Sequence, residues 1–178
     1  MKKFAFATTT LLLLGAGLVA FTIQKPANTS CTATLKWYTW EEAAELNKTA
    51  PKKILVDVYT DWCGWCKRMD QSTFADSTVA AYVAANFYPV KLNAEQKADI
   101  QFNGYTFKYV ADGKVHELAY SLLDGKMQYP NFVYLNEKYE RIMISPGYKE
   151  PKDILKELKF AAEEQYTKTT WEKYRDAN

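Results

Sequence analysis

The residue types that could carry chemistry gather in one short segment, Trp62-Cys63-Gly64-Trp65-Cys66-Lys67. The segment directly follows an apolar, β-branched run at Ile54–Tyr59, which predicts a strand buried on both faces, and it is expected to open a helix. Residues three apart in a first helical turn share one face, within the Cα separation of roughly 4.4–6.8 Å that a disulfide needs. Cys63 and Cys66 can therefore form a disulfide or stand as a dithiol with little backbone movement.

The two thiols are expected to differ in reactivity. Cys63 would stand at the helix N-terminus, where unpaired amides and the helix dipole favour the thiolate. Cys66, one turn further on, would be shielded by the helix and by the packed sheet. Because the thiolate is the attacking species, this placement predicts an exposed nucleophile and a buried resolving thiol.

Two other uses of the cysteine pair have less support in the sequence. A closed zinc site needs four ligands, and beyond the pair the only other cysteine is Cys31 and the only histidine is His116, so we expect no metal. A purely structural disulfide would close a very short loop and would stabilise the chain little through entropy.

His116 is expected to start a helix rather than to act as a catalytic base.

Composition excludes several classes of protein. The 178 residues are 48% hydrophobic and 25% charged, which excludes collagen-like and fully disordered chains. Basic and acidic residues nearly balance, 23 against 21, so the charge gives no indication of a nucleic-acid-binding face. Three cysteines are too few for a disulfide-stapled scaffold, so an apolar core must hold the fold.

The N-terminal segment has the pattern of a targeting signal. A basic start, Met1-Lys2-Lys3, precedes an uncharged apolar stretch, and residues 1–23 are expected to form a secretory signal peptide. About 20 apolar residues also suffice to span a bilayer, so an uncleaved N-terminal anchor is one alternative, and lipid attachment at Cys31 is another. Residues 24–33 are predicted to be a linker. All three alternatives place the domain outside the cytoplasm, in the periplasm or cell envelope, with membrane attachment only if an anchor remains.

Beyond the linker, helix and strand signals alternate along the chain. Helices are predicted at 40–48, from Cys63 onward, from Asp76 to about Phe87, at 95–102, at 116–123 and from Pro151 onward. Strands are predicted at 34–38, 54–59, 88–93, 131–135 and 139–144, with a small β-hairpin at 105–115. This order implies an α/β fold with a central mixed sheet flanked by helices on both faces. We place the domain at 34–165 and a helical or polar tail at 166–178.

The stretch from Ile54 to Lys67 resembles the active-site segment of the thioredoxin family. It combines a strand, an acidic residue, the pattern Trp-Cys-Gly-x-Cys-Lys and a helix in the family's order. The resemblance extends over about 35–164 and implies a thioredoxin fold, to which the hairpin at 105–115 is an insertion. The leading helix with Trp40-Glu41-Glu42 resembles the branch of the family that bacteria export.

The resemblance also implies roles for single residues. Asp57 matches the family's buried acid beneath the second cysteine, where a carboxyl could take a proton from Cys66. Lys91 matches the lysine that pairs with this acid, and Pro130 matches the cis-proline opposite the cysteine pair. The backbone of Tyr129 would then pair with an extended substrate segment. The implied substrate-binding residues are Trp62, Gly64, Trp65, Tyr129 and Pro130.

Trp65 departs from the family pattern. Family members most often have proline before the second cysteine, whereas strong oxidants and isomerases often have histidine there. Trp65 offers no charge that would stabilise the thiolate, and Asp57 and Lys91 match the reductase pattern. We therefore expect a moderately reducing couple.

Together these residues imply an enzyme, an exported thiol–disulfide oxidoreductase that reduces protein disulfides through the Cys63/Cys66 couple. No flavin or nicotinamide motif occurs in the sequence and no cofactor is expected. Electrons would therefore come from another protein, expected to be a thiol donor in the membrane. Two alternatives stay open: a disulfide oxidase or isomerase of the same fold, and a thioredoxin-like binding or chaperone module without turnover.

Overall fold

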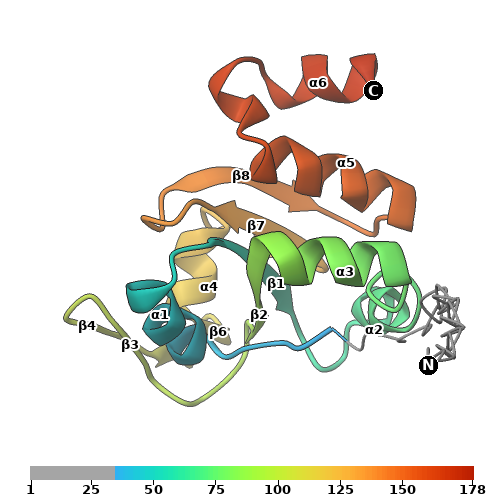
Figure 1. Ribbon diagram of the computed structural model, residues 1–178. Coiled ribbons are helices and arrows are strands. Elements are labelled where there is room, and N and C mark those ends of the chain that lie inside the picture. The colour runs from blue at the N-terminus through green and yellow to red at the C-terminus, as the bar shows by residue number, and fades with distance from the viewer. Residues whose placement is uncertain (1–34) are drawn as a thin grey trace, which may run out of the picture. The chain divides into compact units, whose positions relative to one another are not determined.

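A four-stranded mixed sheet forms the centre of residues 35–178, the part of the chain that the computed structural model describes (Figure 1). The strands lie in the order β2-β1-β7-β8, where β1 is Lys53–Tyr59, β2 is Phe87–Asn93, β7 is Asn131–Leu135 and β8 is Arg141–Pro146. β1 runs parallel to β2 and antiparallel to β7, and β8 runs antiparallel to β7. The expected central mixed sheet is confirmed.

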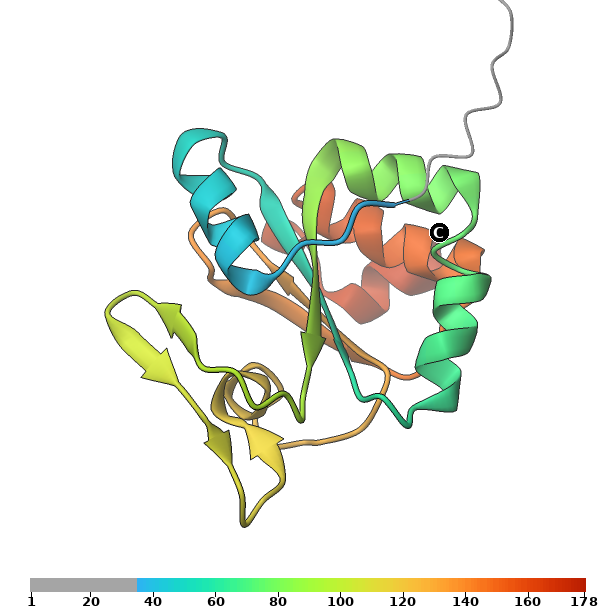
Figure 2. The same cartoon turned by 90° about the horizontal axis from the view of Figure 1, so that it is seen from below.

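Helices cover both faces of this sheet (Figure 2). The helices on one face are α1 (Trp40–Thr49) and α4 (Glu117–Leu122), and those on the other are α2 (Gly64–Gln71), α3 (Ser77–Asn86) and α5 (Pro151–Ala162). Successive strand side chains point to opposite faces, so Val56 joins the core beside α1 while Leu55 joins the core beside α3. β1 is apolar almost throughout because it supplies both cores.

Side chains at the helix starts explain where these helices begin. Thr39 Oγ1 accepts a hydrogen bond from the Glu42 amide, and the Glu42 carboxylate accepts one from the Thr39 amide, which is the predicted capping box. Asp76 caps α3 by accepting hydrogen bonds from two amides of its first turn. Pro151 is the first residue of α5, a position at which its missing amide leaves no hydrogen bond unmade.

The segment between β2 and β7 differs from the prediction. The helix expected at 95–102 is wrong, because this stretch turns and then forms β3 (Ile100–Phe102), which pairs with β4 (Tyr105–Phe107). The connecting Asn103 and Gly104 have φ angles of 51° and 78°, the left-handed pair that a tight hairpin turn requires. β5 (Tyr109–Val110) then pairs with β6 (Val115–His116). The single hairpin expected at 105–115 is therefore wrong in its bounds, because residues 105–107 pair backwards with β3 and the insertion consists of two hairpins (Figures 1 and 2).

Smaller differences occur at two other places. The strand expected at 34–38 is reduced, among the described residues, to a single bridge between Tyr38 and Val90. β8 begins two residues later than predicted, because Tyr139 takes a φ of 65° in the turn before it. The chain also turns at Glu164, where φ is 54°.

A separate helix follows the turn at Glu164. A 3₁₀ turn, η1 (Gln165–Thr167), leads into α6 (Trp171–Ala177). The Trp171 and Tyr174 rings lie 5.4 and 5.3 Å from the Phe160 ring of α5. α6 is therefore held against α5 through aromatic contacts.

The predicted signal or anchor at 1–23, the predicted linker at 24–33 and Cys31 lie outside the described residues. Within residues 35–178, none of the helices has the length and apolar character needed to cross a membrane.

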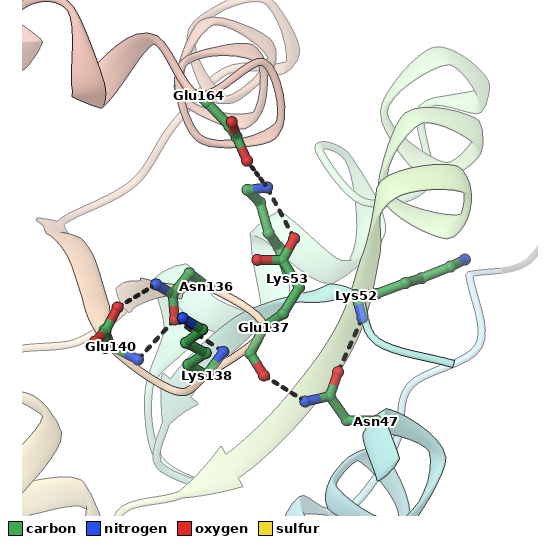
Figure 3. A network of polar contacts seen from close by, with 8 residues as sticks. All are labelled: Asn47, Lys52, Lys53, Asn136, Glu137, Lys138, Glu140 and Glu164. Carbon is green, nitrogen blue, oxygen red and sulfur yellow. Dashed lines mark hydrogen bonds and ion pairs between the residues drawn. The ribbon is translucent and has the colours of Figure 1, made fainter. Parts of the chain in front are cut away.

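A polar network anchors the end of the sheet where β1 begins (Figure 3). The Lys53 ammonium is 2.9 Å from a Glu137 carboxylate oxygen and 3.2 Å from one of Glu164. Asn47 of α1 joins the network by donating to the Glu137 carbonyl at 2.8 Å and accepting from the Lys52 amide at 2.9 Å. Burial lowers the pKa of Lys53, but the two carboxylates outweigh it and the pKa lies above its ordinary value. The network thus joins α1, β1, the β7–β8 turn and the turn that follows α5.

Replacing Lys53 by Ala is expected to lower the free energy of unfolding by about 1–2 kcal/mol, measured by urea denaturation at pH 7. The Lys53 side chain is only 7% exposed, whereas its two carboxylate partners are partly exposed and can regain water. Lys48→Ala is the matched control. The Lys48–Glu45 ion pair lies on the exposed surface of α1, so its removal should leave the free energy of unfolding unchanged. Equal unfolding midpoints for Lys53→Ala and the unsubstituted chain would contradict this role.

Candidate active site at the start of helix α2

The turn between β1 and α2 places both cysteines. The Cys63 amide donates to the Thr60 carbonyl at 3.1 Å, which bends the chain away from β1. Cys63 is the N-cap of α2, and its Sγ accepts a hydrogen bond from the Cys66 amide at 3.1 Å. Cys63 and Cys66 are joined by a disulfide, with their Cα atoms 5.3 Å apart. The predicted helix start and the predicted pairing geometry are both present.

The expected contrast in exposure between the two cysteines is absent from this disulfide form. Cys63 is 4% exposed and Cys66 is 3% exposed. In the disulfide, each sulfur atom covers part of the surface of the other. Cys63 is therefore shielded from solvent as well as Cys66 while the bond is formed. What distinguishes the two is position in the helix: Cys63 lies at its N-terminus, and Cys66 lies among its buried residues.

Two tryptophans form an exposed aromatic rim beside the disulfide. Trp62 is 66% exposed and Trp65 is 59% exposed, although both are large apolar side chains. The Trp62 ring meets the Tyr129 ring edge-on at 5.8 Å, and its indole Nε1 donates to a Glu95 carboxylate oxygen at 3.1 Å. The Trp65 ring lies 5.3 Å from the Tyr148 ring. The rim therefore has a fixed position while its outer surface stays open.

The insertion between β2 and β7 helps to hold this rim. Glu95 and Tyr129 lie near its two ends, and both contact Trp62. Neither contact was expected, since Glu95 was assigned to a helix and Tyr129 only to a substrate contact. No local pattern in the sequence signals a contact between residues this far apart.

Among the described residues, the backbone at Tyr129 is unpaired and the backbone at Gly64 is uncovered. The peptide bond between Tyr129 and Pro130 is cis, as the resemblance implies. Within residues 35–178 the Tyr129 amide and carbonyl make no backbone hydrogen bond, whereas the Pro130 carbonyl accepts one from Gly147 at 2.8 Å. Gly64, between the cysteines, faces open space, since a Cβ there would meet no atom within 4 Å.

Asp57 lies on the face of the sheet that α2 covers. It is two residues from Leu55, which packs in the same core as Met69 of α2, so the two β1 side chains share that face. Asp57 is 1% exposed. Its Oδ2 lies 2.7 Å from the Lys91 ammonium, and its Oδ1 has no hydrogen-bond partner among residues 35–178.

The environment of Asp57 favours the protonated carboxyl. Burial raises the pKa of Asp57 to about 6 from an ordinary value of 3.8, although Lys91 acts in the opposite direction. The pair arises from strand register, because Asp57 and Lys91 are direct neighbours across β1 and β2. The predicted partners are thus brought together, and the carboxyl titrates close to neutral pH.

Lys91 has a second carboxylate partner that sequence reasoning missed. Its ammonium also bonds to an Asp70 carboxylate oxygen from α2. Burial lowers the pKa of Lys91, but Asp57 and Asp70 outweigh it and the pKa lies above its ordinary value. One signal could have found Asp70: it lies four residues after Cys66, on the same face of the helix.

His116 starts α4, as expected, and takes no part in this group. Its Nδ1 accepts from the Leu118 amide at 3.3 Å, and its ring is fully buried with a lowered pKa caused by that burial. In the part of the chain that the structure describes, no group of three or more His, Cys, Asp or Glu side chains is placed to hold a metal ion.

Known proteins match short stretches of this chain. An uncharacterized protein of Caenorhabditis elegans is 30% identical over 67 residues, which is 37% of this chain and 9% of that protein. Spermatogenesis-associated protein 20 of Homo sapiens is 28% identical over 72 residues, which is 40% of this chain and 9% of that protein. The matched stretches are therefore less than a tenth of these longer relatives.

Solved structures share the fold. A DsbH oxidoreductase superposes with a TM-score of 0.55 at 17% identity, covering 79% of this chain and 94% of that one. A thioredoxin from Thermus thermophilus gives 0.53 at 20% identity, covering 71% and 85%. A thioredoxin-fold protein from Helicobacter pylori gives 0.54 at 14% identity, covering 71% and 79%. At these identities the likeness establishes the thioredoxin fold.

The family described as Thioredox_DsbH, "Protein of unknown function, DUF255", matches residues 27–177, which is most of the chain. The match includes the strand–turn–helix segment that carries the Cys63–Cys66 disulfide. This chain is therefore a thioredoxin-fold member of the Thioredox_DsbH family.

Proposed function

We propose that this chain is an exported thiol–disulfide oxidoreductase that reduces protein disulfides. The observation that carries the proposal is the Cys63–Cys66 pair at the N-terminus of α2, directly after a strand buried on both faces. A helix N-terminus lowers the pKa of a thiol placed there. The pair can open to a dithiol and close again with little movement of the backbone.

The reaction follows from the order of the two sulfurs. In the reduced protein, the Cys63 thiolate attacks one sulfur of a client disulfide, forms a mixed disulfide and releases the other client sulfur as a thiolate, which takes a proton from water. Cys66 then loses its proton and attacks Cys63 Sγ. The Cys63–Cys66 disulfide forms and the second client sulfur leaves. Two electrons pass to the client, and the protein ends in the oxidised form.

Asp57 is the group that accepts the proton of Cys66, directly or through water. It lies on the α2 face of the sheet, and its buried Oδ1 makes no hydrogen bond within the described part of the chain and so can accept one. A carboxyl whose pKa is about 6 changes its protonation state readily near neutral pH. The same group can return the proton in the reverse reaction.

The client segment is proposed to bind across the rim. The Tyr129 amide and carbonyl can pair with an extended backbone, next to the cis-proline Pro130. Trp62 and Trp65 offer apolar surface on either side of the disulfide, and Gly64 leaves room between them. Backbone pairing and apolar contact tolerate many sequences, as expected of a protein that acts on more than one client.

Continued reduction needs a thiol donor that returns two electrons to the Cys63–Cys66 disulfide. We propose that this donor is a membrane protein, because residues 1–23 have the pattern of a secretory signal or anchor. The DsbH oxidoreductase that shares this fold supports a redox function for the chain. The placement in the periplasm or cell envelope rests on the N-terminal pattern.

Cys63→Ser and Cys66→Ser are each expected to lower the rate of protein disulfide reduction by at least about 100-fold, since removal of the nucleophile or of the resolving thiol interrupts a two-step exchange. The measurement is insulin reduction with dithiothreitol as electron source. Cys31→Ser is the matched control and should retain full activity, because the proposed exchange uses only the other two cysteines.

Undiminished activity in both substituted proteins would overturn the proposed reaction. The binding or chaperone alternative would be favoured by two results together. The unsubstituted chain would reduce no disulfide, and the double Cys63→Ser, Cys66→Ser protein would still prevent the aggregation of a client protein. A reduction potential near or above about −200 mV in glutathione buffers would favour the oxidase or isomerase.

Asp57→Asn is expected to raise the free energy of unfolding at pH 8 by up to about 3 kcal/mol, because each unit of pKa difference corresponds to about 1.4 kcal/mol. Asp57 binds its proton more tightly in the folded chain, with a pKa of about 6 against an ordinary 3.8. The unsubstituted chain therefore loses stability as the pH rises from about 4 through about 6, and the variant does not.

Urea denaturation of the oxidised proteins between pH 4 and pH 8 measures this effect. The stability difference between the variant and the unsubstituted chain should grow across that range and then level off. Asp176→Asn, which changes an exposed carboxylate of α6, is the control and should show no such trend. A pH-independent difference for Asp57→Asn would contradict a raised pKa at this position.

A further inference from the structure

The Lys91 ammonium lies between two carboxylates of unequal exposure. It is 2.7 Å from Asp57 Oδ2 on the neighbouring strand, and it also bonds to Asp70 Oδ1 from α2. The side chains are 2% exposed at Asp57, 20% at Lys91 and 44% at Asp70. The three groups therefore form a polar chain that leads from the buried carboxyl to solvent.

Aromatic rings restrict where the Lys91 ammonium can go. It lies 4.6 Å from the centre of the Trp37 ring, 5.2 Å from that of Tyr59 and 5.9 Å from that of Phe74. Trp37 meets Phe74 edge-on at 4.9 Å. The residue after Trp37 is fixed to β2 by two backbone hydrogen bonds, one of them from the Lys91 amide. The ammonium is thus held by rings on one side and by carboxylates on the other.

We infer that Asp70 is a positioning residue for the proposed thiol chemistry: by sharing the Lys91 ammonium, it sets how readily Asp57 gives up and takes back a proton. The inference rests on the proposed function. Nothing in the proposed reaction requires Asp70 to touch a cysteine or a client, so its effect passes through Lys91 and Asp57.

The sharing matters because Asp57 must change its charge during the reaction. With Asp57 as sole partner, the partly buried Lys91 would be left without a counterion whenever Asp57 took up a proton. Asp70 keeps a counterion beside Lys91 in both states. Its negative charge also opposes ionisation of Asp57, which Lys91 alone would favour.

The other groups near Asp57 are few. Tyr59 of the same strand and Tyr134 of β7 are close enough for the Asp57 charge to affect their pKa, and burial raises the pKa of both. The Tyr134 hydroxyl donates a hydrogen bond to the Glu157 carboxylate of α5 at 2.9 Å. Glu157 therefore lies beside the core that Tyr134 shares with α3 and α5. Lys91 and Asp70 remain the groups whose charge acts on Asp57.

Direct titration of the Asp57 carboxyl carbon by NMR in the oxidised protein tests the inference. Asp70→Asn is expected to lower the Asp57 midpoint by about half a pH unit, since the 1–3 unit effect of a close charge is reduced at a half-exposed side chain. Asp70→Glu should restore the midpoint, Lys91→Met should raise it, and Asp176→Asn, far along the chain on α6, should not move it. The rate of insulin reduction should be measured against pH for the same proteins. In Asp70→Asn, the fall of this rate at acid pH should move to lower pH, as the Asp57 midpoint does.

The outcomes separate this inference from the proposed function. An active chain with a lowered Asp57 midpoint in Asp70→Asn, restored in Asp70→Glu, supports it. An active chain whose Asp57 midpoint is the same in Asp70→Asn overturns the inference and leaves the proposed function standing. An unsubstituted chain that reduces no protein disulfide overturns both, whatever the midpoints are.

Discussion

The hydrogen bond from the Cys66 amide to Cys63 Sγ is the contact on which the rest of the site depends. It forms at the turn where β1, a strand buried on both faces, ends and α2 begins. The start of α2 in turn fixes where the two sulfur atoms lie. A helix that began one residue earlier or later would point one of them away from the other. The position of the pair therefore follows from where the buried strand β1 ends and α2 begins.

The electrostatics of the site follow from the same strand. Asp57 faces the side of the sheet that α2 covers, where burial opposes its charge, and strand register supplies Lys91 as its counterion. The effect of burial on the pKa of Asp57 is larger than the opposing effect of Lys91, so the pKa is raised to about 6. The aromatic rim has a different origin, since the ends of the insertion hold Trp62 through Glu95 and Tyr129. The sheet thus positions the ionisable groups of the proposed site, and the insertion supports one of the two tryptophans of the rim.

Local patterns in the sequence predicted the elements that local forces decide. The capping box at Thr39, the cap at Asp76 and the apolar run of β1 all lie where expected. Residues 95–102 were assigned to a helix although the Asn103-Gly104 pair that follows favours a hairpin, and the hairpin formed. Contacts that join distant segments, such as Trp37 and Asp70 with Lys91, could not be predicted from one sequence, because they depend on how the elements pack.

The pH dependence of alkylation at each cysteine, followed by peptide mass spectrometry in the reduced protein, tests the central claim most directly. The claim is that placement at the start of α2 makes the two thiols unequal. Cys63 is expected to react with a midpoint well below the value of about 8.5 for a free thiol, and Cys66 is expected to react more slowly with a higher midpoint. Equal rates at the two cysteines, with both midpoints at or above that of a free thiol, would contradict it.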